Sequence, residues 1–409
     1  MRKQLSADAL YSRVKSVFHQ VPEHRKNRSN VKISLPDALM SGLAIFACKY
    51  SSLLKFDTDR KDSEKANNLK NLFSIKGIPS DTQLREILDP VNPEYIRPAF
   101  KKIFTELQRG HELQKFQYLN GHYLMAIDGT GQFGSTKVSC DHCIKKNHRS
   151  GETEYYHQLL GASIVHPEKK QVVPLCPEPI LNQDGTKKQD CERESTKRWL
   201  KKFRQDHSKL KGIILEDALA ANAPHIKTLK THDLRYIIGA KEKGNQALFE
   251  QVKINDQHGL MKEYEYSRII GDKVKKKVTH KFKYLNNLSL NHANPDIKVN
   301  FLEYWETTEY LNPEQDKKKI GTKKVHFSWI TDLEVTSDNV VQIMRAGRSR
   351  WRIENENFKT LKEEATYNLD HSYGHGKENL CTNFAYLTVL SFLIDQTQEI
   401  ACAIFKKAL

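Results

Sequence analysis

The stretch MAIDGTGQF, residues 125–133, decides the fold of this chain. Its apolar start, followed by an aspartate and a glycine, predicts a β-strand that ends at Asp128. A second apolar run, GIILED at residues 212–217, ends in the same way at Asp217. Either aspartate alone is also consistent with a turn or capping residue. Together they predict two carboxylates at the ends of two strands.

A third acidic residue, Glu354, lies in RSRWRIENENFKTLKEE, residues 348–364, whose apolar spacing predicts an amphipathic helix. Alone, Glu354 is equally consistent with a solvated helix charge. Phosphodiester hydrolysis and transfer use two metal ions about 3.5–4 Å apart, and Mg²⁺ prefers oxygen ligands. Asp128, Asp217 and Glu354 therefore form a candidate ligand set for two Mg²⁺ or Mn²⁺ ions.

Three motifs carry a family resemblance: MAIDGT, EDALAANAPHI at residues 216–226, and RWRIE at residues 350–354. They resemble, in order, the acidic motifs of the DDE transposases of bacterial insertion sequences, in the group with a β-rich insertion and a Tyr-Arg-Glu-Lys signature helix. The resemblance covers residues 118–380. It implies an RNase-H-like catalytic core, two Mg²⁺ (or Mn²⁺) ions per site, double-stranded DNA as substrate, and cut-and-paste movement of a DNA element.

The order of the predicted elements agrees with an α/β, RNase-H-like core. It runs as three strands, a helix, a strand, a helix and a strand, with Asp128 on the first strand and Asp217 on the fourth. The expected strands are residues 122–128, 155–165, 171–180, 212–217 and 234–240, and the expected helices are residues 191–205 and 223–232.

Four segments follow from these patterns. Residues 1–115, with helical runs at 7–21, 35–56, 81–89 and 94–110, are expected to form an all-helical domain that binds DNA ends. The further expected segments are residues 116–240, the first part of the core; residues 241–332, a β-rich insertion; and residues 333–409, the core helix with the third carboxylate and a C-terminal helical tail.

The insertion carries a run of basic residues, Lys273, Lys275, Lys276 and Lys277. Phosphate contact and a solvated strand edge guarded by lysine are the two interpretations, and the net charge favours phosphate contact. The resemblance also implies an aromatic residue of the insertion that stacks on a flipped base, for which Trp305 and Trp329 are candidates. For Trp351 we expect core packing.

On the predicted helix, Arg350 lies one turn before Glu354 and is expected to orient the carboxylate or contact a phosphate. The signature tyrosine falls at Gly347 and the signature lysine at Leu361. Lys362, one step out of register, is the basic residue expected to contact DNA there.

Cys140 and Cys143 form a C-x-x-C just after the first aspartate. A zinc site and a reduced structural pair both fit this spacing, because no second C-x-x-C follows. Further along the chain, His371 and His375 are expected to contact DNA or to lie in a loop. The histidines closest in sequence to the cysteine pair are His142, His148 and His157.

Composition agrees with a nucleic-acid partner. The 409 residues contain 66 Lys and Arg against 50 Asp and Glu, a net charge of +16, which suits a protein that neutralises phosphates but also fits an RNA-binding protein. Seven cysteines, an odd number, indicate a reducing cytosol. The longest apolar run, residues 384–394, is shorter than the ~20 residues that a membrane span needs, so no membrane association is expected.

These patterns predict a bacterial, cytoplasmic, nucleoid-associated DDE transposase that acts as a homodimer in a synaptic complex. Two alternatives remain at this stage. One is a catalytically silent DNA-binding or repressor protein on the same fold, and the other is a metal-dependent nuclease without strand transfer. The three intact carboxylates favour an enzyme.

Overall fold

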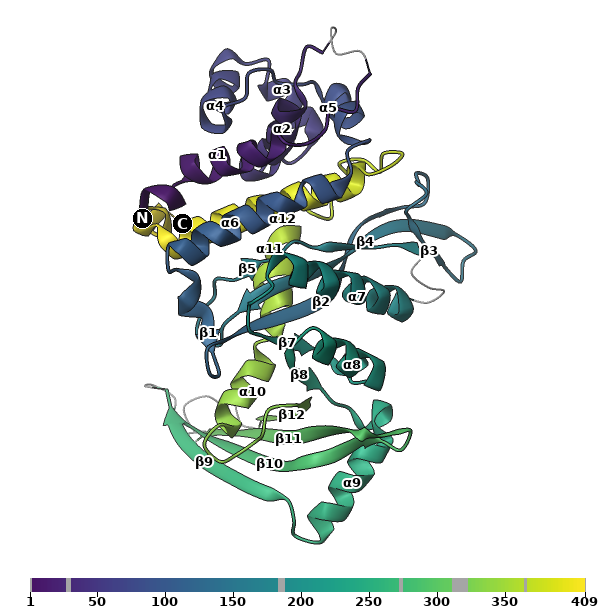
Figure 1. Ribbon diagram of the computed structural model, residues 1–409, viewed down its shortest axis with the longest axis vertical. Helices are drawn as coiled ribbons and strands as arrows, with labels where there is room; N and C mark the ends of the chain where they lie inside the picture. Colours follow the sequence, from purple (N-terminus) through teal and green to yellow (C-terminus); the bar gives the residue numbers. More distant parts are fainter. Residues whose placement is uncertain are drawn as a thin grey trace. The chain divides into compact units, whose positions relative to one another are not determined.

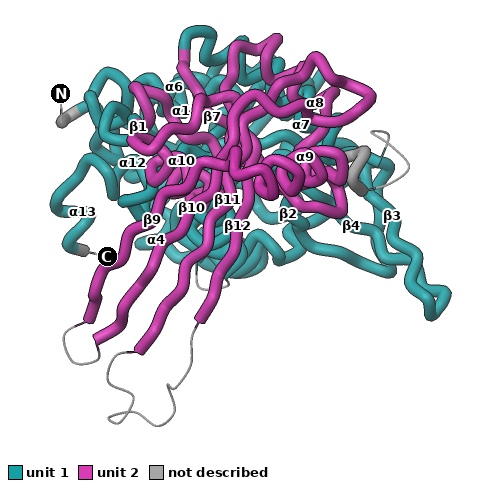
Figure 2. Tube along the Cα trace, turned by 90° about the horizontal axis from the view of Figure 1, so that it is seen from below, with its two compact units in different colours: residues 1–117, 127–209, 351–409 teal, residues 118–126, 210–350 magenta. Residues whose placement is uncertain are grey.

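The computed structural model describes residues 2–26, 31–182, 188–271, 275–310, 323–363 and 366–408. It has a mixed α/β fold that divides into two compact units, coloured separately in Figure 2. Unit 1 contains residues 1–117, 127–209 and 351–409, and unit 2 contains residues 118–126 and 210–350. Strand β2, His122–Ser135, passes from unit 2 into unit 1 after Ala126.

The N-terminal part of unit 1 is helical (Figure 1). A single helix is expected over residues 35–56, but there are two, because Lys49 adopts a left-handed φ of 57° that ends the first of them. Serine or aspartate side chains cap most of these helices. The helices are α1 Ala7–Phe18, α2 Leu35–Ala47, α3 Leu53–Asp59, α4 Ser63–Phe73, α5 Asp81–Leu88 and α6 Arg97–Arg109.

The C-terminal helices of unit 1 are α12, Leu380–Ala401, and α13, Ala403–Ala408. The long helix α12 packs against α2 and α6, and Figure 1 shows it alongside α6. The core between them includes Leu43, Phe100 and Leu387, each at most 3 % exposed. The N-terminal helices therefore share a hydrophobic core with the C-terminal helix.

The sheet of unit 1 is built around β4, Thr153–Val165, which lies beside β2. Three short strands pair with β4 in antiparallel fashion: β3 Ile144–Asn147, β5 Val173–Pro174 and β6 Glu178–Ile180. One strand is expected over residues 171–180, but two form, separated at residues 175–177, where Pro177 removes a ladder donor. Helix α7, Lys188–Asp206, follows.

Unit 2 contains one sheet in the order β2-β7-β8-β12-β11-β10-β9. Strands β2, β7 and β8 are parallel to one another, and the remaining pairs are antiparallel. The last four strands run side by side in Figure 2. The strands are β7 Gly212–Glu216, β8 Arg235–Gly239, β9 Lys262–Ile270, β10 Lys276–Asn291, β11 Asn294–Tyr310 and β12 Lys323–Thr331.

The helices of unit 2 are α8 Ala223–Thr231, α9 Gln246–Gln257 and α10 Val340–Arg348. Helix α9 lies in the segment expected to be β-rich, and the sequence pattern did not indicate it. Two further elements, a π-helix at Ile353–Phe358 and α11 at Lys359–Lys362, follow the return of the chain to unit 1. The two-residue strand β1 is Gln117–Tyr118.

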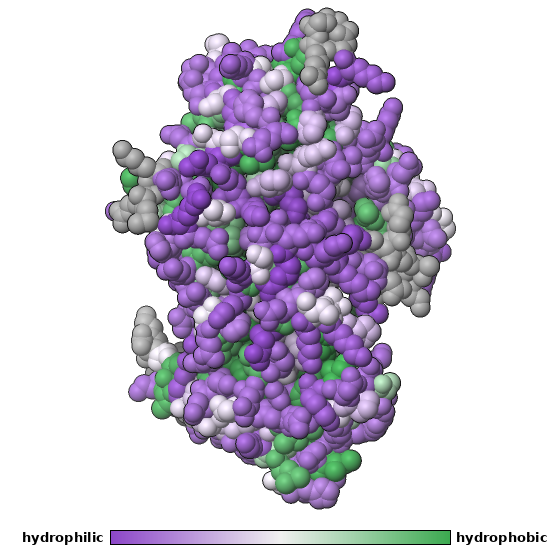
Figure 3. All heavy atoms as spheres, in the orientation of Figure 1, coloured by the Kyte–Doolittle hydropathy of each residue, from purple (hydrophilic) through white to green (hydrophobic). Residues whose placement is uncertain are grey.

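The visible face in Figure 3 is mostly hydrophilic. Apolar residues gather at the lower end of this view. Ile254, near the end of α9, and Leu260 are more than half exposed. Within the described residues, none of the helices combines the length and the apolar character needed to cross a bilayer.

Candidate active site

Asp128 lies in β2, directly after five buried residues at positions 123–127. Its side chain is half-buried, and Oδ1 accepts a hydrogen bond from the backbone N–H of Gly129 at 2.9 Å. The strand continues beyond Asp128 to Ser135, so the expectation that it ends at Asp128 is wrong. The hydrogen bond orients the carboxylate within the strand.

Asp217 directly follows β7 and is exposed. Its Oδ1 accepts a hydrogen bond from the backbone N–H of Leu219 at 2.9 Å. The preceding Glu216 is buried, and its Oε2 lies 2.5 Å from Nε2 of His225 on α8. The turn also packs closely on β8, because a Cβ placed on Gly239 would lie 3.2 Å from the backbone N of Ala218. These contacts fix the turn that carries Asp217.

The register of β2 and β7 relates the two aspartates along their strands. Ala126 of β2 and Leu215 of β7 are partners in the parallel pair. Asp128 lies two residues after Ala126, and Asp217 lies two residues after Leu215. Each aspartate therefore has the same offset from the last paired position.

Glu354 lies in the π-helix Ile353–Phe358 of unit 1 and is half-buried. Two later residues of this helix pack against β4. The Asn357 Nδ2 atom donates a hydrogen bond to Ser163 Oγ at 2.7 Å, and the Phe358 ring lies over Gly161, where an added Cβ would come within 2.4 Å of the ring. This buried contact holds the segment with Glu354 on the sheet of unit 1.

The expectation of one continuous α-helix over residues 348–364 is wrong. Helix α10 ends at Arg348, and Arg350 lies in the turn that follows it. A π-helix has i→i+5 hydrogen bonds and accommodates one residue more than an α-helix of the same length. Beyond it, Leu361 is 2 % exposed, while Lys362 Nζ lies 3.2 Å from Asp370 Oδ1.

The neighbouring acidic residue, Glu356, has a different environment from Glu354. Its Oε1 lies 3.6 Å from Nη1 of Arg352, which also donates a hydrogen bond through Nη2 to the Pro167 carbonyl at 2.9 Å. Burial lowers the pKa of the Arg352 guanidinium. Glu356 is therefore engaged in an ion pair on the surface of unit 1.

The sequence patterns missed one carboxylate beside Asp128. Glu192 on α7 lies against Gly129, where an added Cβ would come within 2.8 Å of Glu192 Oε1. A side chain at position 129 would displace the end of the Glu192 side chain. A glutamate on a basic helix gave no signal of its own, since only the tertiary packing brings α7 to the middle of β2.

Trp305, Trp329 and Trp351 have different surroundings. Trp329 is 5 % exposed, stacks on Phe327 with ring centroids 5.5 Å apart, and covers Gly347, so its assignment to base stacking is corrected to core packing. Trp305 is partly exposed and stacks on His326 with centroids 5.1 Å apart. Trp351 is 47 % exposed, so the expectation of core packing is wrong.

The basic run lies at the start of β10. Lys275 and Lys277 are exposed, and the Lys276 Nζ atom lies 5.0 Å from the centroid of the Tyr310 ring. Lys273 lies outside the described residues.

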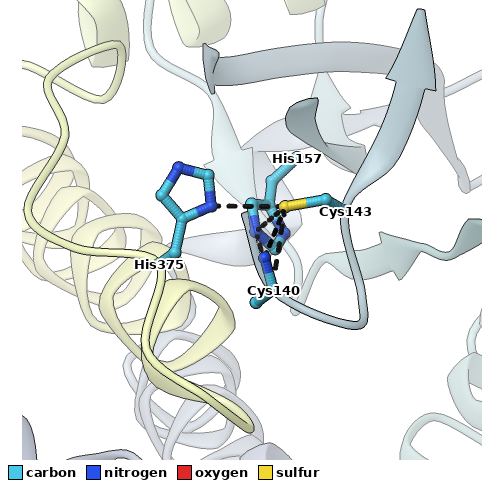
Figure 4. Close-up of side chains that lie close together, drawn as sticks. All are labelled: Cys140, Cys143, His157 and His375. Carbon is cyan, nitrogen blue, oxygen red and sulfur yellow. Dashed lines mark hydrogen bonds between the residues drawn. The ribbon is translucent and has the colours of Figure 1, made fainter. Parts of the chain in front are cut away.

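Cys140 and Cys143 lie between β2 and β3 in unit 1, together with His157 of β4 and His375 (Figure 4). One ligand atom from each of the four residues lies within 4.8 Å of every other. A hydrogen bond with Cys143 and the nearby His157 lower the pKa of the Cys140 thiol. His142 and His148 do not belong to this group, and His148 pairs with Glu154 at 3.0 Å.

Comparison with known families agrees with this arrangement. The family model described as "Transposase DDE domain" matches residues 120–391, which is more than half of the chain. The chain therefore belongs to the DDE transposase family. At this coarse level the family implies an enzyme that cleaves and joins DNA with divalent metal ions. The comparison with curated proteins gave no match.

Proposed function

We propose that the protein is a cut-and-paste DNA transposase, which binds the ends of a mobile element, cuts them and joins the freed 3′-OH to target DNA. The observation that carries this proposal is the equal offset of Asp128 and Asp217 beyond the parallel pair of β2 and β7, within the matched family domain. Because β2 and β7 run in the same direction, both aspartates lie beyond the C-terminal end of the stretch over which the two strands pair. The order β4-β2-β7-β8, with β5 and β6 on β4, further supports an RNase-H-like core.

The proposed catalytic and metal-binding residues are Asp128, Asp217 and Glu354. Three carboxylates fit Mg²⁺ or Mn²⁺, since both are hard cations that take oxygen ligands. Two such ions, when bound, supply activation of the attacking oxygen and stabilisation of the leaving oxygen. The chain contributes orientation: the backbone N–H groups of Gly129 and Leu219 hold the two aspartates.

The π-helix supports the role of Lys362 in DNA contact. Counted along an α-helix, the signature lysine falls at Leu361, which is buried. The additional residue accommodated by the π-helix moves the following positions by one, and Lys362 then takes the position of the lysine. We propose that Lys362 and Arg350 contact phosphates near the cut. Lys362→Ala should weaken binding of the element end, and unchanged affinity would remove this residue from the interface.

Other proposed DNA contacts come from the β-rich insertion and the N-terminal helices. Lys275, Lys276 and Lys277, with Lys273, would contact phosphates, and Trp305 would stack on a displaced base. A fluorescent base analogue at the cut site should lose its stacking response in Trp305→Ala, and an unchanged response would exclude this role. When the DNA of an element end is cross-linked to the protein, the cross-linked sites should lie within residues 1–115.

Because two element ends are cut in one synaptic complex, we propose that the active form is a homodimer. We further propose that it acts at the nucleoid, in a bacterial cytoplasm. Light scattering of the protein with end DNA should give two chains per complex. A mass of one chain per DNA end, with no higher species, would contradict the dimer.

The experiment that tests the function uses the DNA that flanks the gene of this protein. Wild-type protein with Mg²⁺ should cut this DNA at the element end and join the end to a target plasmid. Cutting without joined product would favour a metal-dependent nuclease, and end binding without cutting would favour a catalytically silent DNA-binding protein.

A further inference from the structure

We propose that Cys140, Cys143, His157 and His375 bind one structural zinc ion, separate from the carboxylate site. The four side chains converge from three segments of unit 1 (Figure 4). The two cysteines lie in the loop between β2 and β3, His157 lies on β4, and His375 lies between α11 and α12. Only the cysteine pair and nearby histidines were visible in the sequence pattern.

The distances between donor atoms fit a single tetrahedral ion. The two Sγ atoms are 3.6 Å apart, and the His157 Nε2 atom lies 3.3 Å from Cys140 Sγ and 3.4 Å from Cys143 Sγ. The His375 Nδ1 atom lies 3.2 Å from Cys143 Sγ. With Zn–S bonds of about 2.3 Å and Zn–N bonds of about 2.0–2.1 Å, tetrahedral geometry places two sulfurs about 3.8 Å apart and sulfur and nitrogen about 3.5 Å apart. Small movements of the four side chains would therefore make room for the zinc ion.

A disulfide and a two-iron cluster fit these positions less well. In a disulfide the two sulfurs are about 2.05 Å apart, and a disulfide would not account for the two imidazoles that lie beside them. A two-iron cluster with mixed ligands holds its cysteines on one iron and its histidines on the other. Here sulfur and nitrogen donors are intermixed at hydrogen-bonding distances, as one ion requires.

Burial also favours a bound ion. Cys143, His157 and His375 are 2 %, 7 % and 4 % exposed. Thiols are weak hydrogen-bond partners, so they satisfy buried imidazoles poorly. Two thiolates and one Zn²⁺ ion form a neutral unit with two neutral imidazoles. A neutral unit has a lower free-energy cost of burial than separate charges. The two cysteines bind Zn²⁺ as thiolates, and any proton that a thiol still carries passes to solvent on binding.

The backbone around His375 is built to present this side chain. Gly374 and Gly376 have φ values of 128° and 71°, in the left-handed region that favours glycine. The ring of Phe133 packs edge-on against His375, with centroids 4.7 Å apart. On the far side of the segment, Asp89 accepts hydrogen bonds from the backbone N–H groups of residues 377–380 at 2.8–3.1 Å.

The ion would join segments that are distant in sequence. Cys143 and His375 are 232 positions apart. The first belongs to the loop that follows the Asp128 strand, and the second belongs to the segment that follows the Glu354 helix. A metal that closes such a long loop restricts the unfolded chain strongly. The inferred role is a cross-link that holds these two parts of unit 1 together.

The test measures metal content and ligand identity in full-length, tag-free protein. Wild type and the control Cys176→Ala, which changes a buried cysteine outside the cluster, should each contain about one zinc per chain. Cys143→Ala and His375→Ala should lose it. X-ray absorption should give two sulfur and two nitrogen ligands at the distances above, and Co²⁺-substituted protein should show the visible absorption of a tetrahedral thiolate site.

A second variant covers the case in which the alanine variants do not fold. His375→Cys should retain zinc with three sulfur ligands, because Cys₃His sites also bind zinc. Wild type that contains no zinc and takes up neither Zn²⁺ nor Co²⁺ would overturn the proposal. So would equal zinc in wild type and Cys143→Ala, or a Cys140–Cys143 disulfide in protein kept under reducing conditions. None of these readouts depends on DNA cleavage.

Discussion

Ala126 of β2 pairs in parallel register with Leu215 of β7, and an aspartate follows each of them after one intervening residue. This relationship gives the two aspartates the same position relative to the paired strands. Side chains alternate along strands, so positions with equal offsets from a paired couple are equivalent in the two strands. The proposed assignment of Asp128 and Asp217 to one metal site depends on this register.

Removing either aspartate should separate DNA binding from catalysis. In Asp128→Asn and Asp217→Asn the shape is retained but the negative charge that binds metal is lost. Cleavage of the element end should fall below detection, while the affinity for the same DNA, measured by gel shift in Ca²⁺ or EDTA, should stay within about threefold of wild type. Substantial residual cleavage in one variant would remove that aspartate from the site.

Gly161→Ala should destabilise the contact that holds the π-helix. The new Cβ would come within 2.4 Å of the Phe358 ring, and overpacking of this kind costs about 1–3 kcal/mol in free energy of unfolding. Denaturant titration measures the loss. The matched control is Gly131→Ala, a strand glycine with no atom within 4 Å of the added Cβ. Equal stability of the two variants would show that Phe358 moves freely away.

Glu192→Gln should reduce the cleavage rate without abolishing it. Glu192 lies against Gly129, next to Asp128, where its negative charge would favour bound cations. We expect a decrease of about tenfold and a higher Mg²⁺ concentration for half-maximal rate. The control, Glu194→Gln, changes a residue paired with Lys197 at 2.5 Å and should cleave like wild type. A wild-type Mg²⁺ dependence in Glu192→Gln would assign this residue to packing alone.

The basic run of the β-rich insertion should contribute to the salt dependence of DNA binding. Log affinity falls by about 0.9 per phosphate neutralised for each unit of log salt. Replacement of Lys275, Lys276 and Lys277 by Gln should flatten the slope by about one to three units. An unchanged slope in filter-binding titrations would identify these lysines as a solvated strand edge.

The strands that carry the aspartates were predictable from sequence because their cores are short apolar runs bounded by turn residues. The run at residues 122–128 corresponds to the first half of β2, which continues to Ser135, and the run at 212–217 corresponds to β7. The alternating segments of the insertion correspond to β9, β10, β11 and β12. These patterns arise from local burial, which acts on neighbouring residues.

Features that depend on tertiary contacts were not predictable. The π-helix at Glu354 follows from the packing of Asn357 and Phe358 on β4, and an α-helical count cannot show it. The inclusion of His375 with Cys143 depends on a chain reversal over 232 positions. Helix α9 was not predicted because only two of its residues, Leu248 and Val252, are buried. With so few apolar positions, the helical spacing is weak in the sequence.

The identity of the third carboxylate tests the central claim most directly. Glu354 and Glu356 are two residues apart in the π-helix, and Glu356 pairs with Arg352 at 3.6 Å. The decisive measurement is the Mg²⁺-dependent rate of end cleavage in Glu354→Gln and Glu356→Gln, with equal folding checked by circular dichroism. The proposed site predicts no cleavage for Glu354→Gln and a rate within about threefold of wild type for Glu356→Gln. The reverse result, an active Glu354→Gln and an inactive Glu356→Gln, would contradict it.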